Sequence, residues 1–197
     1  MTTDPNLRAA IDVIVAGHQG DAATVLAAVE SDDAFTRRAA LFALARLKQL
    51  TDDQLLRAFN DPDPQVRIGA AELAANHPGV NVISLLSDDD YLVVEMAAWA
   101  CGERAEIPEE TFAALLRLGT DHEQQLVREA AIAALGALGD ARALPVILKG
   151  CKDKPAVRRR AVLALAPFDG PEVEAAIDEA LKDKDWQVRQ SAEDLRR

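Results

Sequence analysis

Apolar residues recur along this chain in one pattern that returns about every 30 residues. Six segments align without gaps, and within each segment the apolar residues have helical spacing. The second residue of a segment is arginine in five copies, and the fifth is alanine in all six. The segments start at Thr36, Val66, Val93, Val127, Val157 and Val188. Such agreement between six copies indicates an internal repeat.

Acidic and turn-forming residues precede each segment, as in NDPDPQ before Val66 and KDKDWQ before Val188. Aspartate and proline at these places are start signals for a helix. A second apolar stretch lies upstream of each turn, such as DQLLRAF, VNVISLL or VEAAIDEAL. Each repeat is therefore predicted to be an antiparallel helix pair with a short first helix and a longer second helix. Residues 5–16 are predicted to form a further helix that caps the N-terminal end.

These elements predict an all-α fold. One helix pair cannot bury its own apolar face, so the pairs must stack into a continuous core with contacts between neighbours. The composition agrees, because alanine and leucine are good helix formers and aromatic residues make up only 4% of the chain. We predict a right-handed α-solenoid, a superhelix of about six antiparallel helix pairs with an N-terminal cap helix. It is predicted to be a single domain over residues 1–197, with second helices starting near residues 36, 66, 93, 127, 157 and 188.

The arginine at the second position of a segment predicts a ladder of ion pairs. Each arginine would reach an aspartate in its own or a neighbouring turn, for example Arg67 with Asp63 or Asp33. Exposed pairs contribute only about 0.2–1 kcal/mol each, so the ladder would fix the stacking register more than add stability. The alternative is that these arginines only face water. The ladder positions are Arg37, Arg67, Arg128, Arg158 and Arg189.

The segment that agrees best with the shared repeat pattern is DHEQQLVREAAIAALGALGDARALPVIL, which begins at Asp121. This pattern resembles the HEAT-like repeats of the phycobilisome-lyase type, and the resemblance extends over residues 20–197. It implies an α-solenoid whose second helices line a concave surface. It does not specify a function, because such repeats occur in adaptors, in scaffolds and in a few enzymes.

Three enzyme classes follow from the resemblance. A metal-dependent hydroxylase like deoxyhypusine hydroxylase needs several His-Glu dyads, and here only His122–Glu123 forms one, within a turn. A DNA glycosylase needs a basic concave face, which Glu95 and Glu103 oppose. A subunit of a bilin lyase or isomerase remains the alternative function, although no local catalytic motif can be carried over. We expect no catalytic residue, no metal and no cofactor.

Charge and cysteine usage narrow the class of partner. The net charge of −11 argues against nucleic acid, whose binding depends on lysine and arginine. No apolar stretch approaches the roughly 18 to 20 residues of a membrane span, and no signal-peptide pattern is seen at the start. Cys101 and Cys151 are expected to be small buried residues rather than thiol nucleophiles. We expect a cytoplasmic protein that binds a protein or peptide, as a monomer or with weak self-association.

Helical geometry predicts which segment positions are free to bind. At 100° per residue, positions 1, 5, 8, 9 and 12 face the core, whereas positions 3, 6, 7 and 10 point outward. Aromatic residues on outward positions are typical of protein-binding hot spots. The alternative is that curvature buries some of them between helices. The expected groove consists of positions 3 and 7 together with the two residues before each segment. Its candidate partner-binding residues are Phe35, Phe42, Ile68, Tyr91, Glu95, Trp99, Leu163 and Trp186.

A basic run, CKDKPAVRRR, stands out in this acidic chain. It could dock an acidic peptide or a phosphate-bearing ligand. The alternative is an ordinary solvated face. Its candidate residues are Lys149, Lys152, Lys154, Arg159 and Arg160. Together these features favour a non-catalytic protein–protein interaction module or scaffold with a concave binding groove.

Overall fold

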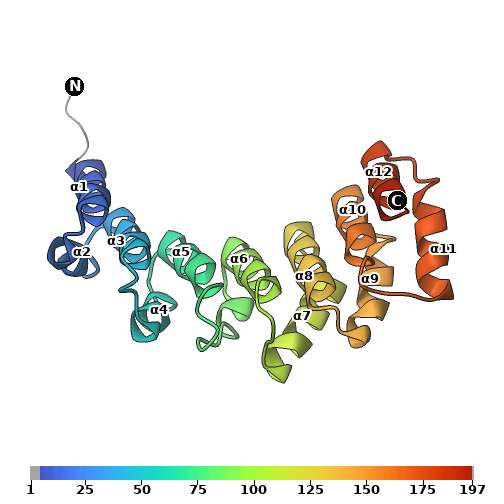
Figure 1. Cartoon of the computed structure of the whole chain (residues 1–197), viewed down its shortest axis with the longest axis horizontal. Coiled ribbons are helices and arrows are strands. Elements are labelled where there is room, and N and C mark those ends of the chain that lie inside the picture. Colours follow the sequence, from blue (N-terminus) through green and yellow to red (C-terminus); the bar gives the residue numbers. More distant parts are fainter. Residues whose placement is uncertain (1–4, 197) are drawn as a thin grey trace. The chain divides into compact units, whose positions relative to one another are not determined.

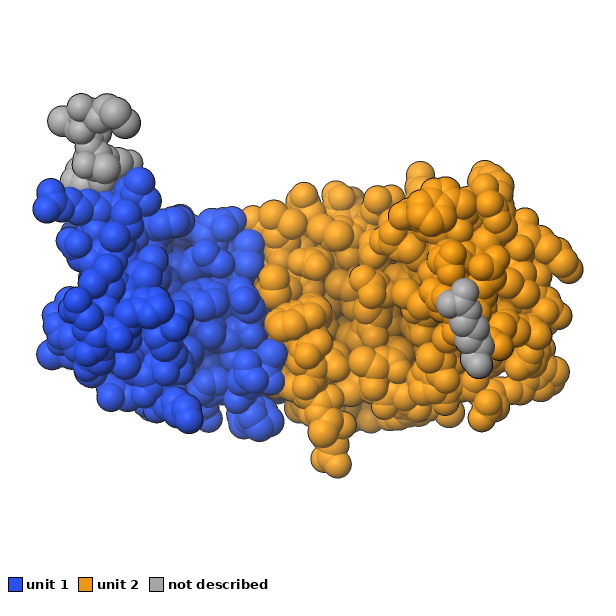
Figure 2. Space-filling model, turned by 45° about the horizontal axis from the view of Figure 1, so that its top comes forward, with its two compact units in different colours: residues 1–85 blue, residues 86–197 orange. Residues whose placement is uncertain are grey.

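The computed structural model describes residues 5–196, and these form α-helices joined by turns and two short 3-10 helices, with no β-strand among them. The prediction of an all-helical repeat fold is therefore confirmed. The chain divides into two compact units, residues 1–85 (unit 1) and residues 86–197 (unit 2), which are coloured separately in Figure 2. The single domain over residues 1–197 stays a prediction, and each unit is described by itself.

Unit 1 has two layers of helices. The second helices α3 and α5 pack side by side, and α2 and α4 pack on them from the other layer (Figure 1). The predicted cap helix is present as α1, and it packs against α3 in the layer of second helices. The bounds are α1 Pro5–Gln19, α2 Ala22–Ala28, α3 Ala34–Arg46, α4 Asp52–Ala58 and α5 Pro64–Ala74.

Unit 2 repeats this arrangement. The second helices α6, α8, α10 and α12 pack in sequence order, and α7, α9 and α11 form the layer of first helices (Figure 1). The bounds are α6 Tyr91–Gly102, α7 Glu109–Asp121, α8 Gln125–Leu138, α9 Leu144–Gly150, α10 Pro155–Ala164, α11 Pro171–Ala180 and α12 Trp186–Leu195. The 3-10 helix η2, Ala141–Ala143, leads into α9.

The third repeat lacks the predicted first helix. VNVISLL was predicted to be helical, but only the 3-10 helix η1, Leu85–Ser87, forms there. The β-branched Val82 and Ile83 have low helix propensity. The side chain of Asn81 also accepts a hydrogen bond from the backbone N–H of Ile83 at 3.0 Å, which offers the backbone an alternative to a helical turn. Val82 is nevertheless fully buried, so the segment still contributes to the core.

Aspartates start several of the second helices, as the turn sequences predict. Asp33, Asp63, Asp90 and Asp185 are N-caps, and the side chain of each accepts a hydrogen bond from a backbone N–H of the first helical turn. Such a cap typically contributes about 1 kcal/mol. Pro155 begins α10 at a position where its missing N–H costs nothing.

The assignment of buried positions is correct for positions 1 and 5, which are buried in all six copies. Position 12 is mostly half-buried, and the prediction that position 6 points outward is wrong. Ile132, at position 6 of α8, is fully buried because it faces the layer of first helices, with its Cδ1 against Gly150 of α9 and its Cγ1 near Gly119 of α7. The other buried residues at position 6 are Leu41, Ala71, Ala98 and Val162. Each second helix thus buries residues on two sides, one against the neighbouring second helices and one against the layer of first helices.

Neighbouring second helices approach most closely at small residues. A Cβ atom on Gly136 of α8 would lie 2.6 Å from Cβ of Ala164 on α10, and one on Gly102 of α6 would lie 2.9 Å from Cα of Ala134. Both contacts join position 10 of one helix to position 8 of the next. The alanine at position 5 serves another contact, since Cβ of Ala161 lies 3.1 Å from where a Cβ of Gly150 would be. Small residues therefore set the helix spacing both within and between repeats.

Candidate functional site

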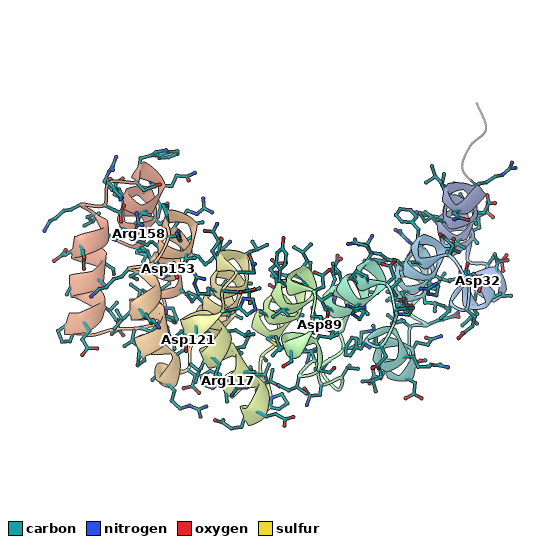
Figure 3. All side chains as sticks on the ribbon, turned by 180° about the vertical axis from the view of Figure 1, so that it is seen from behind. Asp32, Asp89, Arg117, Asp121, Asp153 and Arg158 are labelled. Atoms are coloured by element: carbon teal, nitrogen blue, oxygen red, sulfur yellow. The ribbon has the colours of Figure 1, made fainter. Side chains whose placement is uncertain are left out.

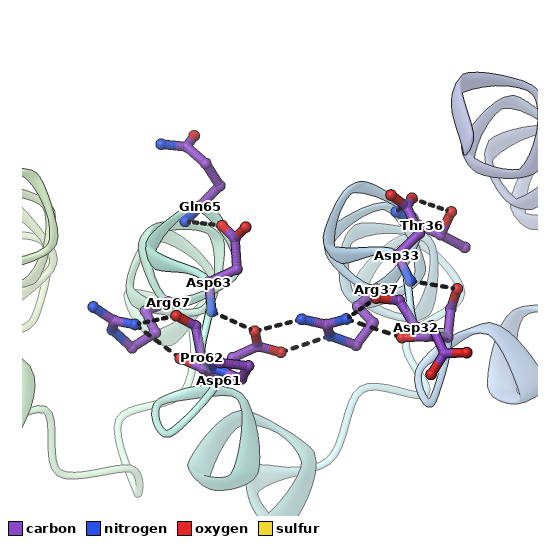
Figure 4. A network of polar contacts seen from close by, with 10 residues as sticks. Asp32, Asp33, Thr36, Arg37, Asp61, Pro62, Asp63, Gln65 and Arg67 are labelled. Carbon is purple, nitrogen blue, oxygen red and sulfur yellow. Dashed lines mark hydrogen bonds and ion pairs between the residues drawn. The ribbon is translucent and has the colours of Figure 1, made fainter. Parts of the chain in front are cut away.

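Arg37, Arg128 and Arg158 of the ladder each reach the turn of the following repeat. In unit 1, Arg37 donates from Nε to Oδ2 of Asp61 at 2.7 Å and from Nη2 to Oδ1 at 2.6 Å (Figure 4). Its Nη1 also donates to the backbone carbonyl oxygens of Ser31 and Asp32. Oδ1 of Asp61 in turn accepts from the backbone N–H of Asp63 at 2.9 Å. One arginine thus holds two successive turns together.

Unit 2 uses the same bonds twice. Arg128 binds both carboxylate oxygens of Asp153 at 2.6 and 2.7 Å, and Arg158 binds those of Asp183 at 2.8 Å. Arg158 also donates to the backbone oxygen of Asp153 at 2.9 Å, and Figure 3 labels this pair. The hydrogen bonds from these arginines hold the pKa values of Asp153 and Asp183 below the usual value for aspartate.

Arg67 and Arg189 also donate to backbone oxygens of the turn before their own helix. Arg67 donates from Nη1 to the carbonyl oxygen of Asp61 at 2.8 Å, and Arg189 donates to that of Asp183 at 2.7 Å. The carboxylates of Asp33 and Asp63, which were suggested as partners of Arg67, act as helix caps. All five ladder arginines are half-buried and hydrogen-bonded rather than only facing water.

The candidate partner-binding residues are divided between the two units. Phe35, Phe42 and Ile68 belong to unit 1, and the other five belong to unit 2. Phe42, Ile68 and Glu95 are half-buried. The exposed members are Phe35, Tyr91, Trp99, Leu163 and Trp186. We call the side of each unit formed by positions 3 and 7 of the second helices the second-helix face. The structure brings only some of the candidates together there, in two hollows: Phe35 with Phe42, and Glu95 with Trp99.

The first hollow, the Phe42 pocket, lies between α1 and α3 of unit 1 and has a volume of about 170 Å³. Phe35 and Phe42 line it together with Ile14, and Arg38 and Arg46 supply positive charge. The guanidinium carbon of Arg38 lies 5.0 Å from the centre of the Phe42 ring, a cation–π contact.

The second hollow, the Trp99 groove, lies in unit 2 between α6 and α8 and has a volume of about 390 Å³. Trp99, which is 40% exposed, lines it. Glu95 and Glu103 of α6 and Glu129 of α8 make its walls acidic, and Arg160 of α10 closes one edge. α8 also contributes Leu126 and four small residues, which we call the alanine floor: Ala130, Ala133, Ala134 and Ala137.

The carboxylates of the Trp99 groove are not equally compensated. Burial raises the pKa of Glu95, and the nearby Glu129 raises it further. Glu129 has cations near it, because Oε1 lies 3.8 Å from Nη2 of Arg159 and 3.6 Å from Nε of Arg160. Within the described part of the chain, no cation is found paired with Glu95. The half-buried charge of Glu95 therefore makes the groove attractive to a positive group.

The basic run does not form one patch. Lys149 belongs to the layer of first helices, where its ammonium donates to the backbone oxygen of Thr120 and lies 3.2 Å from Asp121. Lys152 and Lys154 are exposed in the turn before α10. Arg159 and Arg160 are on the second-helix face. The folding of the chain thus distributes the positive charge over three places.

Neither cysteine is activated as a nucleophile. Burial raises the pKa of Cys101 to about 11 and that of Cys151 to about 12, so both thiols stay protonated at neutral pH. His122 lies in the turn before α8, where its Nδ1 accepts from the backbone N–H of Gln124. Among residues 5–196, no three histidine, cysteine or acidic side chains are grouped closely enough to hold a metal ion. No described helix combines the length and apolarity needed to cross a bilayer.

The sequence interpretation missed several residues of these hollows. Arg38 and Glu129 occupy position 3 of α3 and α8, the position at which Glu95 was selected, so position alone would have found them. Leu126 directly precedes Val127, as Phe35 precedes Thr36, so the same rule would have found it as well. Arg46, at position 11 of its segment, had no such signal, and only the folded structure shows that it borders a hollow.

The repeats match a known family. A family model for HEAT repeats matches residues 53–135 and 79–156, which together span more than half of the chain. No curated protein sequence matches the chain significantly.

Solved structures show the same fold at low sequence identity. An engineered protein is similar with a TM-score of 0.61 and 20% identity, covering 88% of this chain and 94% of its own. A designed armadillo repeat protein in complex with the peptide (KR)4 is similar with a TM-score of 0.60 and 19% identity, covering 87% of this chain and 95% of its own. The described residues hold six copies of the repeat, five of them as stacked helix pairs. With the matching family model, this shows that the chain belongs to the HEAT-repeat family.

Proposed function

We propose that this chain is a non-catalytic interaction module whose second-helix face binds a peptide or a partner domain. The observation that carries the proposal is the Trp99 groove, in which a large aromatic side chain remains exposed on a rigid helix beside a hollow of about 390 Å³. Tryptophan is enriched among the residues that dominate binding energies at protein interfaces. The rest of the fold serves to hold this side chain in place.

Two further observations support a binding role. The similar designed armadillo repeat protein is in complex with a peptide, so the fold is compatible with peptide binding. The two thiols of the chain are kept protonated by burial, which does not favour a cysteine-dependent transfer reaction of the lyase type.

Substitution of Trp99 tests the proposal. Trp99→Ala is expected to leave the helical circular dichroism unchanged, because the side chain is only partly buried. It should weaken partner binding by at least about 1 kcal/mol, roughly fivefold, because it removes the central apolar contact. The partner is captured from extracts of the source cell with the unaltered chain, and the affinity is then measured by calorimetry with purified components.

Leu56→Ala is the matched control, since Leu56 is also a large exposed apolar residue but belongs to α4, in the layer of first helices. It should leave the affinity unchanged. Equal affinity of the Trp99→Ala variant and the unaltered chain would disprove the proposal, and so would a loss of helical structure in that variant.

A further inference from the structure

Unit 1 contains, within its own chain, an arginine bound on the second-helix face. Arg38 at position 3 of α3 lies over the ring of Phe42 at position 7, and its Nη2 lies 4.0 Å from a carboxylate oxygen of Glu72 on α5. A guanidinium is thus held between an aromatic ring and a glutamate of the neighbouring second helix. The arrangement shows that an aromatic ring at position 7, together with a glutamate of the next second helix, can hold a guanidinium group.

In α6 the same positions carry an aromatic ring without the cation. Position 7 is Trp99 and position 3 is Glu95, so a carboxylate stands where α3 has its arginine. The neighbouring helix α8 again supplies a glutamate, Glu129. Among the described residues, none places a guanidinium or ammonium group over the Trp99 ring. Tryptophan is the aromatic side chain that attracts cations most strongly.

The charges around Trp99 favour an added cation. Burial raises the pKa of Glu95, and Glu129 raises it further, so the free protein holds this charge at a cost. The guanidinium groups of Arg159 and Arg160 lie near Glu129, on the α10 side of the groove. A cation that entered beside Trp99 would compensate Glu95, and its attraction would be strengthened by the partial exclusion of water.

We infer that the Trp99 groove binds the cationic side chain of an arginine or lysine in a partner peptide. The cation lies on the indole ring of Trp99 and pairs with the carboxylate of Glu95, and the alanine floor of α8 leaves room for its aliphatic part. A guanidinium fits best, because its plane stacks on an aromatic face and its paired N–H groups match a carboxylate. This inference rests on the proposed function and adds the chemistry of the ligand.

Tryptophan fluorescence tests the inference directly. The chain has two tryptophans, Trp99 and Trp186, so Trp186→Phe leaves Trp99 as the single reporter. In this background, a blocked peptide of repeated glycine and arginine should change the emission of Trp99 in a saturable way, and the lysine analogue should do the same. The analogue with citrulline, which is nearly isosteric with arginine but uncharged, should bind at least about fivefold more weakly.

Glu95→Gln identifies the paired carboxylate. It should weaken binding of the arginine peptide at least about fivefold. Glu172→Gln changes the net charge by the same amount but lies in the first turn of α11, in the other layer, and should have little effect. This control separates a defined site from general attraction of a cationic peptide to an acidic protein.

Glu95→Gln is also expected to raise the melting temperature, because it removes a half-buried charge that faces Glu129. A lowered melting temperature would assign Glu95 a structural role and overturn the inference. Equal binding of the citrulline and arginine peptides would overturn it as well. If that result came together with loss of partner binding in Trp99→Ala, the groove would remain a binding site, and only the cationic ligand would be wrong.

Discussion

The Phe42 pocket of unit 1 and the Trp99 groove of unit 2 are both lined by positions 3 and 7 of a second helix, and the charges around them are opposite. In α3, position 3 is an arginine that covers the ring at position 7. In α6, position 3 is a glutamate, and no guanidinium or ammonium group of the described residues lies over the ring at position 7. The cation at the first ring thus comes from the chain itself, whereas the described residues place none at the second. One backbone arrangement therefore supports two different surfaces.

The difference shows that some positions of the repeat serve the packing of the helices, whereas other positions are free to serve binding. Position 5 is alanine in every copy and fully buried, so it cannot vary without disturbing the packing. Positions 3 and 7 carry charged, aromatic, aliphatic and small side chains in different copies, because they do not set the spacing of the helices. The two hollows thus differ in the residues that the fold leaves free.

The largest expected effect tests whether the two units share their packing. Ala131→Leu in unit 2 and Ala40→Leu in unit 1 should each reduce the free energy of unfolding by about 1–3 kcal/mol, because both alanines are fully buried at position 5. Thermal and urea unfolding measure the change. Ala133→Leu is the control, since Ala133 lines the Trp99 groove at position 7 and has space beside it. An unchanged melting temperature in either position-5 variant would show that the units are packed differently.

A smaller effect is expected from the ladder. Arg37→Ala in unit 1 and Arg128→Ala in unit 2 should each cost about 1–2 kcal/mol of unfolding free energy, because each removes a bidentate, mostly buried ion pair and two bonds to backbone oxygens. Arg117→Ala, on the exposed side of α7, should cost much less. A much larger loss in one unit than in the other would indicate that only that unit depends on the ladder.

The ladder also predicts a dependence on acid pH. The pKa values of Asp153 and Asp183 are lowered in the folded state, first by their hydrogen bonds with Arg128 and Arg158. Their stabilising contribution is therefore complete above the unfolded-state pKa of about 4 and is lost as the pH falls through the lowered folded-state values. Urea unfolding between pH 6 and pH 3 should show this loss, and it should be smaller in Asp153→Asn. An equal acid dependence in that variant would contradict the assignment.

The smallest expected effect distinguishes the two rings. Phe42→Leu should reduce the free energy of unfolding by about 0.5–1 kcal/mol, because it removes the cation–π contact with Arg38. Trp99→Leu should leave it nearly unchanged, since the ring is partly exposed. Chemical denaturation of both variants under one set of conditions gives the comparison. A larger loss for Trp99→Leu would mean that the indole serves packing rather than binding.

Much of the fold could be predicted because the same pattern of apolar, acidic and arginine positions occurs in six copies along the chain. The alanine at position 5, the aspartate caps and the arginine at position 2 each follow from local chemistry. The missing first helix of the third repeat was not predicted, because VNVISLL has the apolar content of a helix and differs only in its β-branched residues and Asn81. The burial of Ile132 was also missed, because a helical wheel does not show that a second helix contacts two layers.

The hollows could be predicted less well than the fold. Trp99 was found because it is an aromatic residue at the outward position 7, and Glu95 because it is at the outward position 3 of the same repeat. Glu129 is at the same outward position 3, but its proximity to Glu95 could not be predicted, because it depends on the spacing of α6 and α8, where Gly102 and Ala134 pack closely. The basic run shows the reverse case, since residues adjacent in sequence are distributed over different faces of the helices.

The bonds between Arg37 and Asp61, Arg128 and Asp153, and Arg158 and Asp183 are the same at each of these junctions. A junction of this kind does not depend on which two repeats it joins. Duplication or loss of a DNA segment that encodes one whole repeat would therefore preserve every arginine–aspartate bond on either side. This gives such a chain a simple genetic route to a longer or shorter array, with a new copy whose positions 3 and 7 are free to diverge.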